Sequence, residues 1–246
     1  MGDCGGAGGP RYGAAVLLAE VEAFYSRPIA PTRRLALGDL DLPCDPAPGY
    51  GGLLLGAVVA RFARELHADD HDDIAALIAH LEHYGQVPQP RLRHRLQLDS
   101  IGLQRCVHQL HGEGDQLRIE LDEGNGSPTQ HVLCALYAAA TLPEGLRSNV
   151  MTTLRRAMGW RGGMGDALIT HLSGRVSGMS VTAVGDPVAW AIGVLDLRAG
   201  PVPTRKDVQR AFRDRLRDAH PDHGAADDHA AQRIAELSEA RRILLG

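Results

Sequence analysis

The spacing of the apolar residues changes twice along the chain, and these changes limit how it can fold. Residues 53–66, which begin with an apolar run, and residues 72–84, which begin with two aspartates, are both interpreted as helices. Within residues 92–98 and 117–121 the apolar side chains alternate with polar ones, which is typical of half-buried strands. Helical spacing returns after Ser127-Pro128, a helix-start signal. We therefore expect an α+β fold that is mostly helical, with a small antiparallel meander in its N-terminal part.

The remaining N-terminal segments are interpreted from the same kinds of pattern. Apolar residues at helical spacing predict a helix over residues 14–25. Five prolines predict a long irregular segment over residues 28–52. A turn at 112–115 separates the strand at 117–121 from a weaker strand candidate at 103–110. Further helices are expected at residues 128–141, 144–158 and 165–172.

Length and composition favour one large or two small globular domains. The chain has 246 residues, of which 44% are hydrophobic and 23% are charged, as in ordinary globular proteins. Glycine and serine are frequent just before residue 186, which indicates a linker there. The expected division is a flexible tail at 1–10, an N-terminal α+β domain of unknown function at 11–175, a linker at 176–186 and a second domain at 187–246.

Several classes of protein are disfavoured by the sequence. The net charge of −4 argues against a chain devoted to nucleic acid or to an anionic membrane surface. No apolar run approaches the roughly 18–20 residues of a membrane span, and the N-terminus lacks the basic and apolar regions of a signal peptide. The four cysteines lie far apart, without zinc-site or disulfide-framework spacing. We therefore expect a cytoplasmic protein with reduced thiols and without a bound metal or cofactor.

Residues 204–219 predict an amphipathic helix with a basic side. Thr204, followed three residues later by Asp207, resembles a capping box at the helix start. At about 100° per residue, an apolar face that includes Val208 and Phe212 lies opposite a basic stripe. Such a stripe is either a solvated helix face or a docking surface for an acidic partner. The stripe consists of Lys206, Arg210, Arg213 and Arg217.

The tripeptide His220-Pro221-Asp222 follows this helix directly. Proline disfavours the helical conformation of the residue before it, so the helix should end here. A further helix is expected over residues 227–245, and a short one is expected to begin at Pro187. The two longer helices would pack antiparallel, with the tripeptide exposed at the tip of their hairpin.

This order of features resembles the J domain of DnaJ-type co-chaperones. The resemblance covers residues 187–246 and rests on Arg-Ala-Phe-Arg at 210–213, on His220-Pro221-Asp222, and on Glu-Leu-Ser-Glu-Ala-Arg-Arg-Ile-Leu at 236–244. Val194-Leu195-Asp196-Leu197 occupies the family's Ile-Leu-Gly-Val place, with Asp196 where glycine is usual. The resemblance implies a short helix followed by an antiparallel helical hairpin.

The resemblance also implies a function. J domains dock on a DnaK-type heat-shock ATPase, stimulate its ATP hydrolysis and thereby trap a client peptide. His220, Pro221 and Asp222 would carry the trigger, and the stripe of Lys206, Arg210, Arg213 and Arg217 would supply the docking charges. The N-terminal domain would then supply specificity for a client or partner. A protein of this kind performs no bond chemistry of its own, so we expect no enzyme activity.

Two other classes of function stay open. One is a divergent J-like interaction module that does not stimulate an ATPase. The other is an enzyme whose N-terminal domain holds a site without a familiar motif. The sequence contains no nucleophile elbow, Walker A loop, dinucleotide fingerprint or H-E-x-x-H, so such a site would have to be of another kind.

Two charged clusters in the N-terminal part allow more than one interpretation. The histidines and aspartates of residues 67–73 could suggest a metal site, but a solvated turn before a helix explains them more simply. A set of arginines could form the wet face of a sheet or an anion-binding surface. These are Arg91, Arg93 and Arg95 on one predicted strand, with Arg105 and Arg118 nearby.

Overall fold

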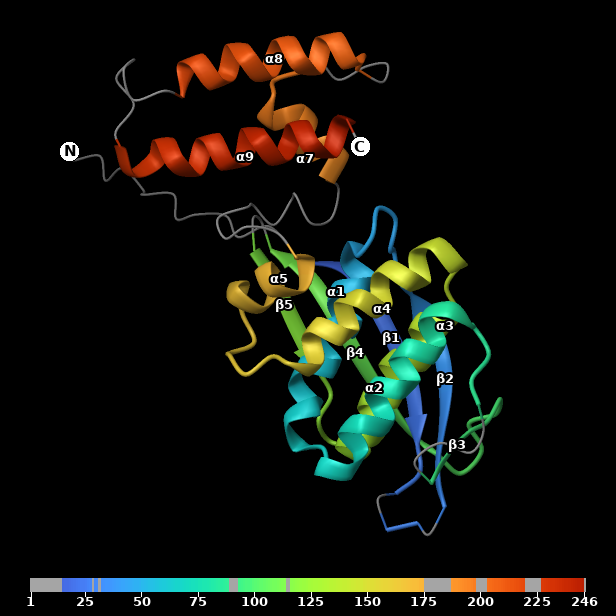
Figure 1. The fold of residues 1–246 in the computed structure, drawn as a ribbon. Coiled ribbons are helices and arrows are strands. Elements are labelled where there is room, and N and C mark those ends of the chain that lie inside the picture. Colours follow the sequence, from blue (N-terminus) through green and yellow to red (C-terminus); the bar gives the residue numbers. More distant parts are fainter. Residues whose placement is uncertain are drawn as a thin grey trace, which may run out of the picture.

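Figure 1 shows the computed structural model of the chain. It describes residues 15–27, 29–30, 32–88, 93–113, 116–174, 187–197, 203–219 and 227–245. The expected tail at 1–10 and the expected linker at 176–186 lie outside these residues. The described buried apolar residues form two separate clusters, one in the N-terminal part and one among the last three helices.

A five-stranded mixed sheet organises the N-terminal part, in the order β3-β2-β1-β4-β5. All neighbours pair antiparallel except β2 and β3, which pair in parallel. The expected three-stranded meander is therefore wrong. β4 and β5 do form a hairpin, but β3 lies at the opposite edge of the sheet, because β1 and β2 stand between it and β4. The strands are β1 (Val16–Tyr25), β2 (Arg33–Asp41), β3 (His94–Leu96), β4 (Gln104–Glu113) and β5 (Gln116–Leu121).

The first strand corrects two further predictions. Residues 14–25 were expected to be helical, but β1 lies inside the sheet with Ala23 opposite Leu37 on one side and Cys106 on the other. Alternate residues of β1, from Ala19 to Tyr25, are buried, which is the period of a strand. The segment at 28–52 was expected to be irregular, but it contains β2 and the beginning of the first helix.

The helices of the N-terminal part cover one face of the sheet in two layers (Figure 1). α1 and α3 contact the strands and are buried on nearly every side, as expected for helices between two layers. α4 and α5 pack on α1, α2 packs on α3 and α4, and all three leave polar residues exposed. The helices are α1 (Gly49–Phe62), α2 (Ala68–His83), α3 (Pro128–Ala140), α4 (Glu144–Met158) and α5 (Asp166–Ser173), with a short 3-10 turn η1 (Ala63–Glu65) after α1.

These helices were largely predicted by the sequence. The expected segments at 128–141 and 144–158 correspond closely to α3 and α4. α3 begins with a full capping box, in which Ser127 accepts from the backbone of Gln130 and the Gln130 side chain accepts from the backbone of Ser127. α2 begins four residues earlier than expected, so Asp69 and Asp70, rather than Asp72 and Asp73, lie in its first turn.

The last three helices share the second cluster. They are α7 (Pro187–Val194), α8 (Arg205–Asp218) and α9 (Asp227–Leu245). Figure 1 shows α8 and α9 side by side and running in opposite directions, and the two helices contact each other. The cluster includes Leu195, Val208, Leu237 and Ala240. None of the helices among the described residues has the length and hydropathy needed to cross a bilayer.

Candidate functional site

The two long sides of α8 have different chemistry. Val208 is fully buried, and Phe212 packs against the same cluster. The other side carries the four basic residues that the sequence singled out, and all of them are exposed. They are Lys206, Arg210, Arg213 and Arg217. The structure therefore brings these side chains together on one exposed helix surface, which we call the basic face.

Contacts at both ends of α8 hold this helix in position. The expected capping box is present, since Asp207 N–H donates to Thr204 Oγ1 (3.3 Å) and Thr204 N–H donates to the Asp207 carboxylate (3.2 Å). Hydrogen bonds from Thr204 hold the pKa of the Asp207 carboxyl below its ordinary value. Arg215 pairs with Asp196 in the turn after α7. The Arg241 guanidinium of α9 lies 4.9 Å from the centre of the Phe212 ring.

Contacts with other described residues use only a few of the hydrogen-bond donors of the basic face. Arg210 donates to Asp207 at 3.2 Å, and Arg213 Nε donates to the backbone oxygen of Gln209 at 3.2 Å. A guanidinium has five N–H donors in a planar fork, so one such contact leaves room for a carboxylate of a partner. The face can therefore bind an acidic surface.

The expected trigger residues come directly after this helix in the sequence. α8 ends at Asp218, and Ala219 caps it. His220, Pro221 and Asp222 follow in the sequence but lie outside the described residues.

The outer face of the sheet does not form the arginine surface that the sequence allowed. Arg105 pairs with Glu22 on β1, and this contact holds the pKa of Glu22 below its ordinary value. Arg118 pairs with Glu113 and Glu120, each at 2.8 Å. Arg95 lies on β3, at the edge opposite β5, and Arg93 lies just before it; Arg91 is outside the described residues. Arg105 and Arg118 are thus paired with carboxylates, and Arg93 and Arg95 lie at the opposite side of the sheet from them.

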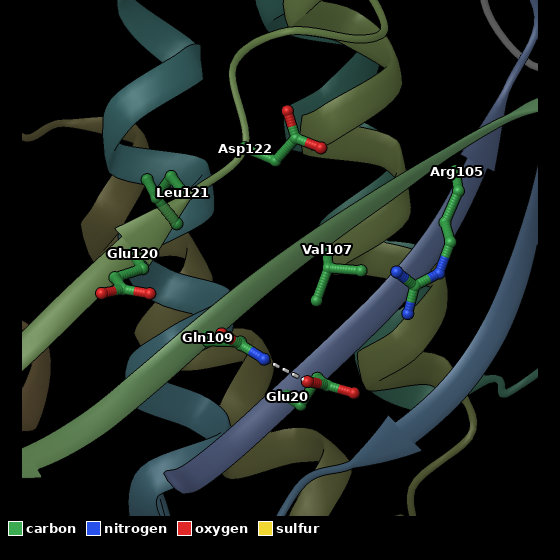
Figure 2. Close-up of a pocket in the computed structure, with 7 residues that line it drawn as sticks. All are labelled: Glu20, Arg105, Val107, Gln109, Glu120, Leu121 and Asp122. Atoms are coloured by element: carbon green, nitrogen blue, oxygen red, sulfur yellow. Dashed lines mark hydrogen bonds between the residues drawn. The ribbon is translucent and has the colours of Figure 1, made fainter. Parts of the chain in front are cut away.

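A polar hollow of about 350 Å³ lies on this outer face (Figure 2). Figure 2 shows Gln109 of β4 donating to Glu20 of β1 across the two strands. Three carboxylates and one guanidinium line the hollow, so it is not suited to an anionic ligand. Its lining consists of Glu20, Arg105, Val107, Gln109, Glu120, Leu121 and Asp122.

A larger cavity of about 670 Å³ lies at the start of α2, where the sequence predicted a solvated turn. The His67 ring accepts from Asp69 N–H (3.4 Å), and Thr129 donates to Asp70 (3.1 Å). Both acidic and basic groups line the cavity, so its charge favours neither an anionic nor a cationic ligand. Its lining consists of Ala30, Arg33, His67, Asp69, Asp70, Asp73, Arg93 and His94.

One cluster of potential metal ligands was missed by the sequence analysis. The ligand atoms of Cys106, His108 and His131 all lie within 4.8 Å of one another, and all three residues are buried. Burial lowers the pKa of His108 to about 3, with a contribution from His131, and burial lowers the pKa of His131 to about 4. Both imidazoles are therefore neutral at pH 7, the form that binds a metal. The available signal was Cys-x-His on a strand, but His131 is 23 residues further along.

No family model, no curated protein and no solved structure matches this chain. Its function is therefore inferred from its own residues and their arrangement.

Proposed function

We propose that the chain is a J-type co-chaperone that docks on a DnaK-type heat-shock ATPase and stimulates its ATP hydrolysis. The observation that carries the proposal is the exposed basic face of α8, which directly precedes His220-Pro221-Asp222 in the sequence. The apolar side of the same helix packs with α7 and α9, so the basic side chains are left for a partner.

The turn after α7 gives independent support. Asp196 stands where J domains usually have glycine, and its φ is +51°, in the left-handed region that favours glycine. The order of a short helix, a basic helix and a longer third helix also agrees with the family. The J-type hairpin with its short preceding helix is thus the arrangement that we propose for residues 187–246.

The proposed action is a change in the partner's conformational equilibrium. The basic face would meet an acidic surface of the ATPase, and the loop at 220–222 would bind preferentially to the conformation that hydrolyses ATP. A ligand shifts an equilibrium only by its differential affinity for the two states, so both contacts are required. The chain itself would catalyse no reaction and need no cofactor. The N-terminal part would bind a client or partner, in the cytoplasm.

Binding to a purified DnaK-type ATPase tests the docking part of this proposal. We expect the double variant Arg210→Glu/Arg213→Glu to bind about tenfold more weakly or worse at low salt, because it replaces two attractive charges with repulsive ones. Wild-type binding should also weaken as the salt concentration rises. Titration by calorimetry at two salt concentrations measures both effects.

A matched variant separates local charge from net charge. Arg27→Glu/Arg161→Glu makes the same change in net charge at exposed positions of the N-terminal part. It should bind like the wild type. Equal loss in both double variants, or salt-independent binding of the wild type, would contradict a role for the basic face.

The turn at Asp196 gives a prediction about stability. Asp196→Gly and Asp196→Ala both remove the pair with Arg215, but only glycine relieves the left-handed conformation. That conformation costs an L-residue roughly 1–2 kcal/mol, so the glycine variant should be more stable than the alanine variant by about that amount. Denaturant unfolding of the two variants measures the difference. Equal stability would mean that residue 196 does not adopt a positive φ.

One observation favours the second candidate, an interaction module that binds without stimulating. Asp214 and Asp218 are exposed on α8, where many J domains have basic residues. Their carboxylates reduce the attraction of this helix for an acidic partner. Such a module would bind in the titration above and yet leave the ATPase rate unchanged.

A further inference from the structure

Two strand residues and one helix residue meet in the core of the N-terminal part. Cys106 and His108 are two positions apart on β4, so both point to the face that the helices cover. His131 lies in the first turn of α3, which packs on that face. Their exposed fractions are 1%, 0% and 1%, so the cluster is closed to solvent.

The distances between the ligand atoms of this cluster suit tetrahedral coordination of a metal ion. His108 Nε2 lies 3.1 Å from His131 Nδ1, and Cys106 Sγ lies 3.6 Å from His108 Nε2. Zinc bonds of about 2.0–2.1 Å to nitrogen and 2.3 Å to sulfur place two tetrahedral nitrogens about 3.3 Å apart and a nitrogen and sulfur about 3.6 Å apart. The side chains therefore need little movement to accept an ion between them.

The surroundings fix the orientation of the imidazoles. The His131 ring stacks on Phe62, with centroids 3.8 Å apart and planes 6° apart, and meets the Tyr25 ring edge-on at 4.9 Å. His131 also forms a hydrogen bond with the backbone of Asn125. Packing and an outer hydrogen bond of this kind hold a histidine ligand in its binding orientation.

A second observation points to a ligand beside the three residues. The Tyr25 hydroxyl is fully buried beside the thiols of Cys134 and Cys106 and forms no well-aligned hydrogen bond with a described group. Burial raises the pKa of Tyr25 well above its ordinary value, and the two thiols add to this rise. Cys134 follows His131 by three positions on α3, which places both on the same side of the helix.

We propose that Cys106, His108, His131 and Cys134 form a binding site for Zn²⁺ or a similar divalent ion. Two cysteines and two histidines are a common zinc ligand set. Two thiolates neutralise the charge of the ion, which suits a site without access to water. Cys134 is assigned as the fourth ligand for this reason, since a site with one thiolate would bury a net positive charge. Its thiol lies outside the group of ligand atoms within 4.8 Å of one another, so this side chain must move toward the ion.

Binding of the ion releases two thiol protons and moves one histidine proton. Without the ion, Asp122 N–H donates to His108 Nδ1 (3.2 Å), so the His108 proton is on Nε2 and is donated to His131 Nδ1. When the ion binds, the two thiol protons pass to solvent. The His108 proton moves from Nε2 to Nδ1, and the contact with Asp122 N–H is lost. The binding free energy of the ion must offset the loss of that hydrogen bond.

Cobalt binding during refolding tests the proposal. Because the cluster is buried, the ion enters as the chain folds, so the full chain is unfolded with chelator, freed of metal and refolded with Co²⁺. We expect one Co²⁺ per chain, with a thiolate-to-cobalt charge-transfer band and visible bands of tetrahedral cobalt, both abolished by added Zn²⁺. Zn²⁺ should raise the melting temperature of the refolded chain, whereas Mg²⁺ should not.

Variants locate the ion within the chain. Cys44→Ser removes a buried thiol outside the cluster and should leave the cobalt bands unchanged. Cys134→Ser and Cys106→Ser each leave one thiolate, so each should bind Co²⁺ more weakly and reduce the charge-transfer band to half or less. If the wild-type chain refolds without cobalt bands and without a zinc-dependent melting temperature, the cluster is a dry hydrogen-bonded group and the proposal is wrong. This measurement does not require the variants to fold.

Discussion

Replacing His220 with glutamine is expected to return ATP hydrolysis by a DnaK-type partner to its unstimulated rate. The proposed coupling depends on the tripeptide at 220–222, whereas the basic face supplies attraction that does not by itself distinguish the partner's states. Coupling free energies of about 1–3 kcal/mol correspond to shifts of roughly 5–150-fold in the partner's conformational equilibrium. A single-turnover hydrolysis assay, with the wild type and the variant at saturating concentration, measures the loss directly.

His223→Gln provides the matched control. It makes the same chemical change three residues later in the chain, outside the tripeptide. This variant should stimulate like the wild type, and circular dichroism should show the same helical content for all three chains. If His220→Gln stimulates as well as the wild type, or if the wild type does not stimulate at all, the co-chaperone function is excluded. Binding without stimulation would leave the interaction module as the function.

The starts of α3 and α8 could be predicted because their signals are local. Ser127 with Gln130, and Thr204 with Asp207, each bind backbone groups within three residues, so both capping boxes appear in the structure where the sequence suggested a start. The basic stripe of α8 was predictable for the same reason, since helical geometry alone brings its residues together. These interactions do not depend on how distant parts of the chain pack.

β1 could not be identified in this way because its pattern is ambiguous. Its buried positions are Ala19, Val21, Ala23 and Tyr25, and two of them are alanines that hardly mark an apolar face. The larger apolar residues Val16 and Leu17 are exposed instead. Pairing with β2 and β4 decides the conformation of this segment, and β4 is more than 80 residues away. Tertiary contacts here outweigh local spacing.

Neither the strand order nor the cluster of Cys106, His108 and His131 could be predicted from the sequence, and the reason is the same for both. β3 and β4 are neighbours in the sequence, but β1 and β2 separate them in the sheet. Cys106 and His131 are far apart in the sequence, yet they meet because α3 packs on the face of the sheet to which Cys106 points. Sequence spacing alone cannot show either arrangement, because both are set by the packing of whole elements.

Gln130 links α3 to the turn between β1 and β2 through several buried hydrogen bonds. Its amide nitrogen donates to the backbone oxygens of Ser26 (3.2 Å) and Arg34 (3.0 Å). Its amide oxygen accepts from the backbone N–H of Ser127 (2.9 Å). Arg34 O also accepts from Ser26 N–H, so it would keep one partner without Gln130. The Ser26 backbone oxygen and the Ser127 N–H would lose the Gln130 side chain as their hydrogen-bond partner.

Gln130→Leu is therefore expected to lower the free energy of unfolding by about 2–5 kcal/mol, because each orphaned buried group costs roughly 1–3 kcal/mol. Such a loss is a large part of the 5–15 kcal/mol that is typical of a folded domain. Gln109→Leu makes the same change on the half-buried outer face of the sheet, where it removes contacts with Glu20 and His111 that water can replace, and should cost about 1 kcal/mol or less. Urea unfolding of the full chain, monitored by circular dichroism, measures both. Equal costs would show that Gln130 does not hold α3 to the sheet, and the position of His131 beside β4 would then need another cause.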